Sequence, residues 1–533
     1  MRPWGAVPSL SAWCWCLAAV LQLHAPLCDG LRALALFHYH GYSHWVMFRP
    51  LLLELARRGH HVTVLSHFPQ DNAPPTYEDR SLKAAVPPIV NTFSFDFAMS
   101  SSMIKFIWFE MQSFCRPNFE HPVTKELIKN KEKFDVILLE VFGPDCFAAF
   151  HHHLGGVPVV GMTSSVMLPW GNSRVGNPDN PAYIPNYFMP FSSRMTFWER
   201  LANTVSTFAT SVGFDLLVPG SVDELNREYF GNEVPKTLDL VKNLSLLLVN
   251  SHFSINFPRP LVPNVVEVGG IHVPTTAKPL PKELQQFLDG APGETGAVLF
   301  TFGSLVRADT LPTDTLLAFA EAFRQLRPQR FIWKLDAAAA ASRGVALPDN
   351  VLATTWLPQF DVLSHPKVRA FISHGGLMGT LEAVHCGVPV LGIPLFADQK
   401  LNVPNMVRHG VAVQLDINHI TTDQVVDALR KLTAPGSEYW TRAKQVSALF
   451  RDRPRPPLEE AAYWVEYVAR HQGAPHMRSA ALDLSWYQYL LLDVVAFVAL
   501  AAAAALAVLW LLCRKLISLA LPPTKGPRKA KAS

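Results

Sequence analysis

The chain has 533 residues, of which 49% are hydrophobic and 17% charged, so it is neither largely disordered nor small enough for one ordinary core. Its formal net charge is +4, but residues 514–533 contain six basic side chains and no acidic one, which leaves the rest of the chain at −2. This distribution excludes a broadly basic surface that binds nucleic acid.

Residues 1–29 have the pattern of a cleaved secretory signal peptide. Arg2 is followed by an apolar run and then by small residues up to Gly30. A basic start, an apolar middle and a small-residue end are typical of segments removed during export, and an uncleaved anchor is the alternative. We therefore expect the folded part of the chain to begin near residue 30.

Residues 30–265 are predicted to form a first α/β domain. Residues 46–58 have the apolar periodicity of a helix that ends at Gly59, and the irregular stretch 165–235 is expected to form loops that line a pocket. Four apolar runs are typical of strands: 31–37, 60–66, 134–140 and 158–164. Strands that alternate with helices predict a mostly parallel sheet.

A second α/β domain is predicted over residues 266–440. It overlaps a segment rich in proline and glycine, residues 256–281, that is typical of a linker. Its predicted strands are 296–304, 330–335, 368–376 and 388–394. Residues 441–488 are then expected to form helices that lead towards a membrane.

A membrane-spanning helix is predicted at residues 489–513, because residues 494–513 are apolar, uncharged and long enough to cross a bilayer. Arg514 begins a basic tail, residues 514–533, which the positive-inside rule places in the cytosol. Lysines at the third and fifth positions from the end resemble a dilysine retrieval signal. Together these features predict a single-pass protein of the endoplasmic reticulum membrane with a lumenal body.

Three cysteines lie in the predicted lumenal body: Cys115, Cys146 and Cys386. The other four fall in the predicted signal peptide or at the end of the predicted span. Because the three lack a regular spacing and the chain has no CxxC pair, we expect free or packed thiols rather than disulfides.

Residues 37–45, FHYHGYSHW, place three histidines between the first predicted strand and helix. His38 and His40 form a His-x-His pair that some metallohydrolases use, but a metal ion would need further ligands. The only candidates are the histidines 151–153, near the end of a predicted helix, where histidine commonly faces solvent or the helix dipole. The chain also has no Asp-x-Asp motif, so we expect no metal ion and no cofactor.

The turns between strands and helices lack the GxGxxG pattern and the Walker loop, which disfavours a nucleotide-dependent oxidoreductase. Two other turns suit a phosphate. Residues 373–376, SHGG, and 302–304, FGS, place glycines where a strand ends. Backbone N–H groups in such turns can face an anion.

Residues 356–399 carry a longer pattern, from WLPQ at its start to FADQ at its end. This stretch resembles the signature of the UDP-glycosyltransferases, and the resemblance extends over nearly the whole chain. It is greatest for the animal membrane-bound branch and for the arthropod members within it. The resemblance implies two Rossmann-like domains that face each other across a cleft, the GT-B fold, with the acceptor bound by the first domain and the UDP-sugar by the second.

The resemblance assigns the nucleoside to three residues. Trp356 would stack on uracil, Gln359 would bond the base or the ribose, and Glu382 would hold the ribose hydroxyls. Each assignment suits its chemistry, because a flat ring prefers an aromatic face and a diol prefers a carboxylate acceptor.

The rest of the donor is assigned in the same way. Asp398 and Gln399 would hold the sugar hydroxyls, and Arg259 in the linker would be a further phosphate contact. Residues 377–380 read LMGT, where plant relatives carry Trp-Asn-Ser and vertebrate ones Thr-Asn, and Met378 cannot hydrogen-bond as asparagine would. Four residues are expected around the diphosphate: Ser304, His374, Gly375 and Gly376.

The resemblance makes His44 the general base, which takes the proton of an acceptor hydroxyl as that oxygen attacks the anomeric carbon. The acid that orients it is expected after a later strand, which ends LLEVFGPDC. Glu140 has the strand-end position of the vertebrate acid, whereas Asp145 keeps its residue type but needs a shift, so both stay open. Either would fix the tautomer of the imidazole.

These observations predict an inverting hexosyltransferase that acts on a small lipophilic acceptor, in the detoxification or metabolism of phenols, steroids or pigments. Glucose is favoured over glucuronic acid by the arthropod resemblance. A catalytically silent lipophile-binding protein of the same fold is the alternative, and the short tail disfavours a single-pass receptor. Homo-oligomerisation and the use of the Asn243 glycosylation sequon stay open.

Overall fold

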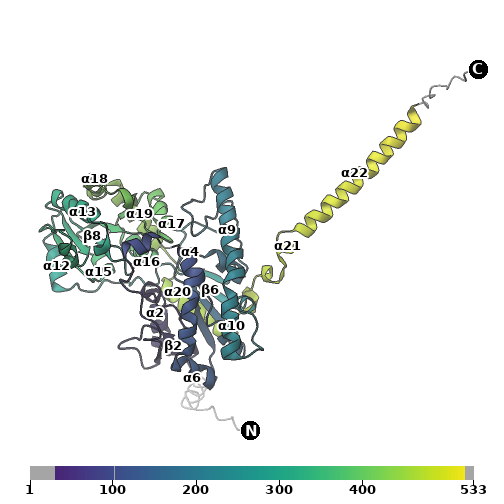
Figure 1. The fold of residues 1–533 in the computed structure, drawn as a ribbon, viewed down its shortest axis with the longest axis horizontal. Helices are drawn as coiled ribbons and strands as arrows, with labels where there is room; N and C mark the ends of the chain where they lie inside the picture. Colours follow the sequence, from purple (N-terminus) through teal and green to yellow (C-terminus); the bar gives the residue numbers. More distant parts are fainter. Residues whose placement is uncertain (1–29, 101, 522–533) are drawn as a thin grey trace, which may run out of the picture. The chain divides into compact units, whose positions relative to one another are not determined.

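The structure is a computed structural model that describes residues 30–100 and 102–521 (Figure 1). The described residues up to Arg478 form one compact unit, and those from Ser479 onwards form a second. The predicted signal peptide and the end of the predicted tail, from residue 522, lie outside the described residues.

The first unit contains two sheets, and the first sheet has seven strands in the order β3-β2-β1-β4-β5-β6-β7. Its strands are β1 (Arg32–Leu36), β2 (His61–Ser66), β3 (Tyr77–Ser81), β4 (Val136–Glu140), β5 (Val159–Thr163), β6 (Leu244–Val249) and β7 (Val265–Glu267). All pairs are parallel. The central strands are apolar and buried, as a sheet covered by helices on both faces requires.

The second sheet has six strands in the order β10-β9-β8-β11-β12-β13. They are β8 (Ala297–Thr301), β9 (Arg330–Lys334), β10 (Val351–Thr354), β11 (Val368–Ser373), β12 (Val390–Gly392) and β13 (Ala412–Gln414). These strands also pair in parallel, so the predicted pair of Rossmann-like domains is confirmed. In each sheet the strand order reverses beside the first strand, and ligands of open α/β sheets bind at such a point, beyond the carboxyl ends of the strands.

Helices cover both sheets. In the first domain they are α2 (Tyr42–Arg57), α3 (Phe95–Ser100), α4 (Met103–Lys105), η1 (Phe106–Glu110), η2 (Met111–Phe114), α5 (Cys115–Glu120), α6 (Pro122–Asn130), α7 (Ala149–His153), α8 (Pro169–Val175), α9 (Phe197–Leu217), α10 (Pro219–Phe230) and α11 (Thr237–Val241). Those that follow β7 are α12 (Lys282–Asp289), η3 (Ala308–Thr310), α13 (Thr313–Gln325), α14 (Ala337–Ser342), α15 (Gln359–Leu363), α16 (Leu377–Cys386), α17 (Gln399–Arg408), η4 (Ile417–His419), α18 (Thr422–Thr433), α19 (Glu438–Arg451), α20 (Pro457–Arg470) and η5 (Pro475–Met477).

Helix α2 forms because its apolar residues recur every three or four positions and pack against the first sheet. Gly59 follows the helix with a φ of 88°, a left-handed conformation that glycine adopts without strain. The helix begins at Tyr42, earlier than the sequence pattern indicates, so His44 lies in its first turn rather than in the preceding loop. Its buried side chains include Trp45, Phe48, Leu51, Leu52 and Leu55.

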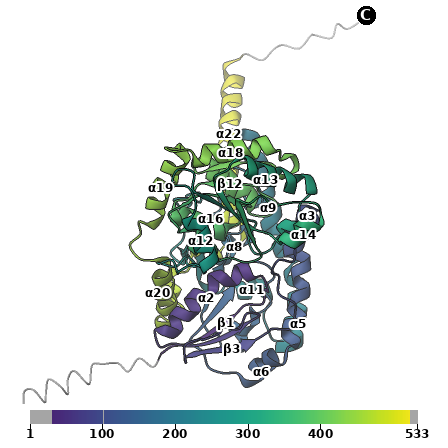
Figure 2. The ribbon, with the colours of Figure 1, turned by 90° about the vertical axis from the view of Figure 1, so that its left-hand side faces the viewer.

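The chain returns to the first domain after the second one is complete. Helix α19 packs on the second domain, but α20 lies beside α2 of the first (Figure 2). Glu466 of α20 also pairs with Arg58, at 3.1 Å between Oε1 and Nη1. Helices of the predicted stretch 441–488 therefore pack against both domains. The α20 side chains in the buried cluster of β1 and α2 are Ala461, Ala462, Val465 and Val468.

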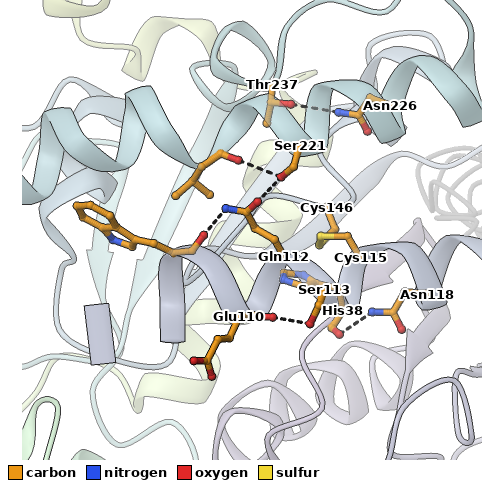
Figure 3. Close-up of a disulfide and its surroundings, with 12 residues drawn as sticks. His38, Glu110, Gln112, Ser113, Cys115, Asn118, Cys146, Ser221, Asn226 and Thr237 are labelled. Carbon is orange, nitrogen blue, oxygen red and sulfur yellow. Dashed lines mark hydrogen bonds between the residues drawn. A yellow bond between two sulfur atoms is a disulfide. The ribbon is translucent and has the colours of Figure 1, made fainter. Parts of the chain in front are cut away.

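Cys115 and Cys146 form a disulfide, so the prediction of free thiols was wrong for these two (Figure 3). Cys115 begins α5 and Cys146 follows β4, and the fold brings their Cα atoms to 5.4 Å. The two cysteines are 31 residues apart, which matches no regular cysteine spacing. They come together only because the fold places the start of α5 next to the loop after β4. Cys386 is free, as predicted.

Removal of this disulfide, by Cys115→Ser with Cys146→Ser, is expected to lower the free energy of unfolding by about 2–4 kcal/mol, because the unfolded chain loses a covalent loop. Thermal unfolding followed by intrinsic fluorescence will measure the change. Cys386→Ser is the matched control and should leave the midpoint almost unchanged. An unchanged midpoint for the double variant would contradict the bond.

The second unit contains η6 (Ala480–Asp483), α21 (Trp486–Tyr489) and α22 (Leu492–Ala520). Helix α22 has 29 residues and is apolar enough to cross a membrane by length and composition, in agreement with the apolar helix predicted at the C-terminal end. One other helical stretch in the described residues passes the same criteria, Phe197–Phe230, which comprises α9 and α10 of the first unit.

Candidate active site

A cavity of about 470 Å³ lies between the two domains, and both contribute to its walls. His44 lines it from the first domain. The second domain contributes Ser304, Trp356, Gln359, His374, Gly376, Glu382, Asp398 and Gln399. The structure therefore brings together residues that the sequence separates by more than 300 positions. Two of the predicted donor residues do not line the cavity: Arg259, and Gly375, which follows His374 in the turn after β11.

His44 is held by a carboxylate. Its Nδ1 lies 2.5 Å from Oε1 of Glu140, which ends β4 and whose side chain is 1% exposed. Since a carboxylate accepts at Nδ1, the second ring nitrogen of a neutral imidazole keeps its lone pair. Tyr39 and Phe142 pack edge-on against the ring, with centroids 4.7 and 4.4 Å away, and fix its plane.

Asp145, the other acid left open, has a different partner. Its Oδ2 accepts a hydrogen bond from Nη2 of Arg174 in α8, at 2.5 Å, and both side chains are largely buried. Burial raises the pKa of Asp145 to about 6, against the opposing effect of Arg174. Of the two alternatives, therefore, Glu140 is the one that contacts His44.

The predicted nucleoside residues all line the cavity. Trp356 follows β10 and leaves 52% of its surface exposed, which is unusual for an indole and leaves a face open for a ring. Gln359 donates from Nε2 to Oε2 of Glu382 at 2.5 Å. Burial raises the pKa of Glu382 to about 7. Because a carboxylate can accept several hydrogen bonds, the bond from Gln359 leaves acceptor capacity for hydroxyl groups.

The turn after β11 leads into the N-terminus of α16. Gly375 has a φ of 81°, and Gly376 is the N-cap. A Cβ at Gly303 or Gly376 would lie 2.8 or 2.7 Å from the ring of His374, so this close approach needs glycine. Burial lowers the pKa of His374 to about 4, and its Nδ1 has no hydrogen-bond partner. The neutral ring and the first amides of α16 are free to face an anion.

Lys334 is a site residue that the sequence analysis missed. It ends β9, and its Nζ donates to Oδ1 of Asn91 at 2.9 Å and to the carbonyl of Gly303 at 2.6 Å. The same Nζ lies 5.0 Å from the ring centroid of Trp356. Burial lowers the pKa of Lys334 to about 8. The signal was a basic residue at the carboxyl end of a buried strand, in the sequence RFIWKL.

The predicted sugar residues line the cavity as well. Burial raises the pKa of Asp398 to about 6, and Nδ2 of Asn402 donates to it at 2.8 Å. Gln399 uses its Oε1 to accept from the backbone N–H groups of Leu395 and Phe396, at 2.9 and 3.1 Å. Its amide nitrogen is what remains for a ligand.

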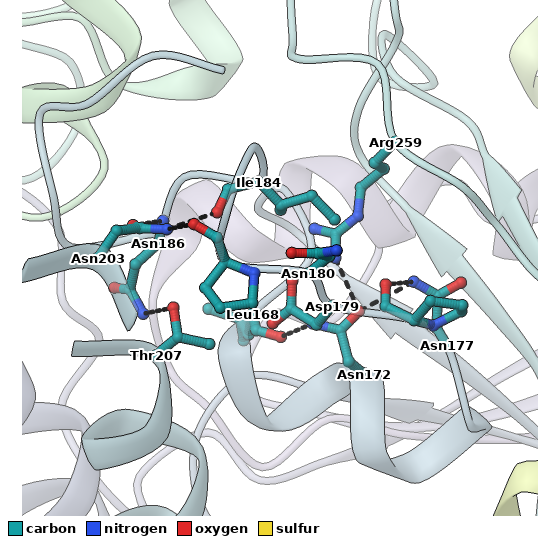
Figure 4. A network of polar contacts seen from close by, with 12 residues as sticks. Leu168, Asn172, Asn177, Asp179, Asn180, Ile184, Asn186, Asn203, Thr207 and Arg259 are labelled. Atoms are coloured by element: carbon teal, nitrogen blue, oxygen red, sulfur yellow. Dashed lines mark hydrogen bonds and ion pairs between the residues drawn. The ribbon is translucent and has the colours of Figure 1, made fainter. Parts of the chain in front are cut away.

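Arg259 does not reach the cavity, which corrects the expectation of a phosphate contact. Its Nη2 donates to Asn172 at 3.0 Å and to Asp179 at 2.9 Å (Figure 4). Asn172 in turn accepts from Asn177 at 3.0 Å. The network fixes the long loop after α8, so Arg259 stabilises the wall of the first domain rather than the donor.

Part of the cavity lining is apolar, but of the irregular stretch 165–235 only Tyr187 contributes an apolar side chain to it. The individual residues were not predicted, because they come from short segments far apart in the chain. Its apolar lining includes Phe93, Met103, Phe106, Phe142, Tyr187 and Phe396.

Of the other histidines of the two clusters, His38 and His40 are buried and His152 is exposed. Burial, with a smaller effect of His67, lowers the pKa values of His38 and His40 to about 3 and 4. His151 and His153 bond backbone carbonyls at 2.7 and 2.8 Å. Among the residues that the structure describes, no three metal-ligating side chains form a group. That transfer needs no metal stays a prediction.

Comparison with known proteins agrees with this geometry. A family model described as UDP-glucoronosyl and UDP-glucosyl transferase matches residues 34–521. UDP-glucosyltransferase 2 of Dactylopius coccus is 41% identical, over 92% of this chain and 94% of its own length. UDP-glucuronosyltransferase 2B1 of Rattus norvegicus is 33% identical, over 86% and 88%. The crystal structure of TcCGT1 in complex with UDP shares the fold, with a TM-score of 0.53 at 16% identity over 82% of this chain and 99% of that chain.

Proposed function

We propose a specific reaction for this chain, which belongs to the UDP-glucoronosyl and UDP-glucosyl transferase family and is therefore a UDP-glycosyltransferase: transfer of glucose from UDP-glucose to a hydroxyl group of a small lipophilic acceptor. The observation that carries the proposal is the His44–Glu140 pair in the same cavity as Trp356, Glu382 and Asp398.

The chemistry is a single displacement. The second ring nitrogen of His44 takes the proton of the acceptor hydroxyl as its oxygen bonds to the anomeric carbon, and the bond from that carbon to the diphosphate oxygen breaks. Glu140 stabilises the imidazolium that forms, and UDP leaves with the bonding electron pair. Because no enzyme nucleophile intervenes, the anomeric configuration inverts.

The donor is held by three kinds of contact. Trp356 offers a face to uracil, and Glu382, steadied by Gln359, accepts from the ribose hydroxyls. The amides at the start of α16 and the partly buried ammonium of Lys334 stabilise the leaving diphosphate. Lys334 already has two hydrogen-bond acceptors and keeps its third donor for this anion.

The sugar is glucose rather than glucuronic acid. UDP-glucosyltransferase 2 of Dactylopius coccus, at 41% identity, is named for glucosyl transfer. The cavity also contains Asp398, which accepts hydrogen bonds from the side-chain amide of Asn402 and from the backbone of Leu377, both of them neutral groups. With a pKa of about 6 this carboxyl is mostly ionised at neutral pH, so it repels the carboxylate of glucuronic acid and accepts from the hydroxyls of glucose.

Membranes that contain the full chain are expected to use UDP-glucose at least about tenfold better than UDP-glucuronic acid in kcat/KM, a difference of about 1.4 kcal/mol. Phenols and steroids serve as acceptors, and mass spectrometry identifies the conjugates. Asp398→Asn should reduce the ratio of kcat/KM for UDP-glucose to that for UDP-glucuronic acid, because it removes the repulsion between Asp398 and the carboxylate of glucuronic acid. A higher kcat/KM with UDP-glucuronic acid would overturn the choice of sugar and leave the family assignment intact.

The acceptor is apolar and contains a flat ring system, because aromatic side chains such as Phe93, Phe106 and Phe142 line the cavity. Such molecules partition into lipid. The disulfide and the apolar helix α22 support an oxidising lumen and an anchor in the endoplasmic reticulum membrane. The function is therefore conjugation of lipophilic phenols, steroids or pigments at that membrane.

A further inference from the structure

Helix α9 carries its apolar face outwards. Residues 201–214 contain no charged side chain, and, besides Leu217, six large apolar residues of α9 are between 50% and 76% exposed. They follow one another mostly at four-residue or three-residue intervals and so share one face: Phe197, Trp198, Val205, Phe208, Val212 and Leu216. Figure 1 shows α9 at the periphery of the first unit. A row of this kind on a soluble surface marks an interaction site.

The opposite face of α9 is polar and buried, the reverse of an ordinary surface helix. Asn203 accepts from the backbone N–H of Asn186 at 2.8 Å and donates to the carbonyl of Ile184 at 2.8 Å (Figure 4). Asn186 donates to the hydroxyl of Thr210 at 3.0 Å. These bonds tie the inner face to the first domain, so the helix cannot rotate to bury its apolar face.

These bonds also decide how α9 would meet a membrane. By length and composition the stretch Phe197–Phe230 is apolar enough to cross a bilayer. A crossing helix, however, would have to leave the domain and carry Asn203, Thr207 and Thr210 into lipid without their hydrogen-bond partners, which is unfavourable for each polar group. A helix with one apolar face and one fixed polar face lies flat in the interface instead.

We propose that the outer face of α9 lies in the boundary between headgroups and acyl chains of the bilayer that α22 crosses. The proposal rests on the membrane anchoring proposed above. The residues between Arg478 and α22, 479–491, reach about 45 Å at full extension, so the first unit stays near the bilayer in any case. Transfer of these six side chains from water to an apolar environment is favourable.

The experiment uses the full chain in phosphatidylcholine vesicles. A recognition sequence for a site-specific protease is inserted between Leu484 and Ser485, and after cleavage the vesicles are floated on a density gradient. The first unit is expected to float with the vesicles although it is no longer joined to α22. A triple variant, Val205→Asp, Phe208→Asp and Val212→Asp, should instead leave at least about nine-tenths of the first unit in the soluble fraction, because charged side chains do not enter the acyl region.

The matched control places the same change on exposed apolar residues of other helices: Leu317→Asp, Val407→Asp and Leu449→Asp. This variant should float like the parent chain. Retained binding of UDP-glucose shows that each variant is folded.

Release of the parent first unit after cleavage overturns the proposal, whether it is released as a monomer or as a dimer joined through α9. Flotation of the aspartate variant overturns it as well. Flotation does not depend on turnover. A first unit that floats but transfers no sugar therefore contradicts the proposed function alone, and one that transfers glucose but is released contradicts the docking alone.

Discussion

His44→Ala will lower kcat for glucose transfer by about 10²–10⁴-fold while UDP-glucose still binds. Nδ1 of the His44 imidazole lies 2.5 Å from the buried carboxylate of Glu140. The other ring nitrogen, Nε2, can therefore accept a proton. Alanine leaves the acceptor hydroxyl without a base, and a neutral hydroxyl is a poor nucleophile at neutral pH. Trp356, Glu382 and the turn at Gly376 remain in place, so affinity for the donor changes little.

The measurement is a single-turnover rate with saturating UDP-glucose, beside an equilibrium titration of the same nucleotide. His152→Ala is the matched control, because this histidine is exposed on α7. Its rate should equal that of the parent chain. Full activity of the His44 variant would show that His44 is not the base. An inactive His44 variant that also fails to bind UDP-glucose would indicate misfolding instead.

Substitutions of Glu140 and Asp145, the two acids at and after the end of β4, are expected to have different effects. Glu140→Gln is expected to reduce kcat by about 10²–10⁴-fold with little change in KM for UDP-glucose, because an amide cannot stabilise the imidazolium of His44. Glu140 is thus a positioning residue. Asp145→Asn is expected to keep kcat and to cost about 3 kcal/mol of folding free energy, because the buried guanidinium of Arg174 loses its counter-charge.

Each variant needs both readouts, transfer kinetics and urea unfolding. The opposite pattern, with kcat lost in Asp145→Asn and kept in Glu140→Gln, would exchange the two roles. Glu140→Asp is the conservative variant. It shortens the carboxylate by one methylene and should recover part of the kcat that glutamine loses, which a purely structural role would not predict.

The sequence predicts the fold well because both sheets consist of short apolar runs between periodic helices. Residues 134–140 give β4 almost to the residue, and residues 31–37 give β1. Most of the residues that the sequence assigns to the donor also line the cavity, and three of them, Trp356, Glu382 and Asp398, lie within one continuous stretch of the sequence. Residues that lie close together in the sequence can be assigned to one site from their spacing.

The remaining features depend on contacts between distant segments. Glu140 and Asp145 differ by five positions, and the path of the loop after β4 decides which of them meets His44. Cys115 finds Cys146 because of how α5 lies on the sheet. Lys334 becomes a site residue only when Asn91, from the first domain, reaches across to it. None of these approaches leaves a periodicity in the sequence.

The return of α20 to the first domain sets the order in which the protein can mature during synthesis. The last strand of the first sheet ends at residue 267, but the helix that covers β1 and α2 begins at Pro457. At an ordinary rate of translation, roughly 10–40 s pass between synthesis of β7 and synthesis of α20. The apolar surface around Trp45 and Leu52 therefore stays uncovered during that interval. The second domain is synthesised in that interval, so the domain made first is the one completed last.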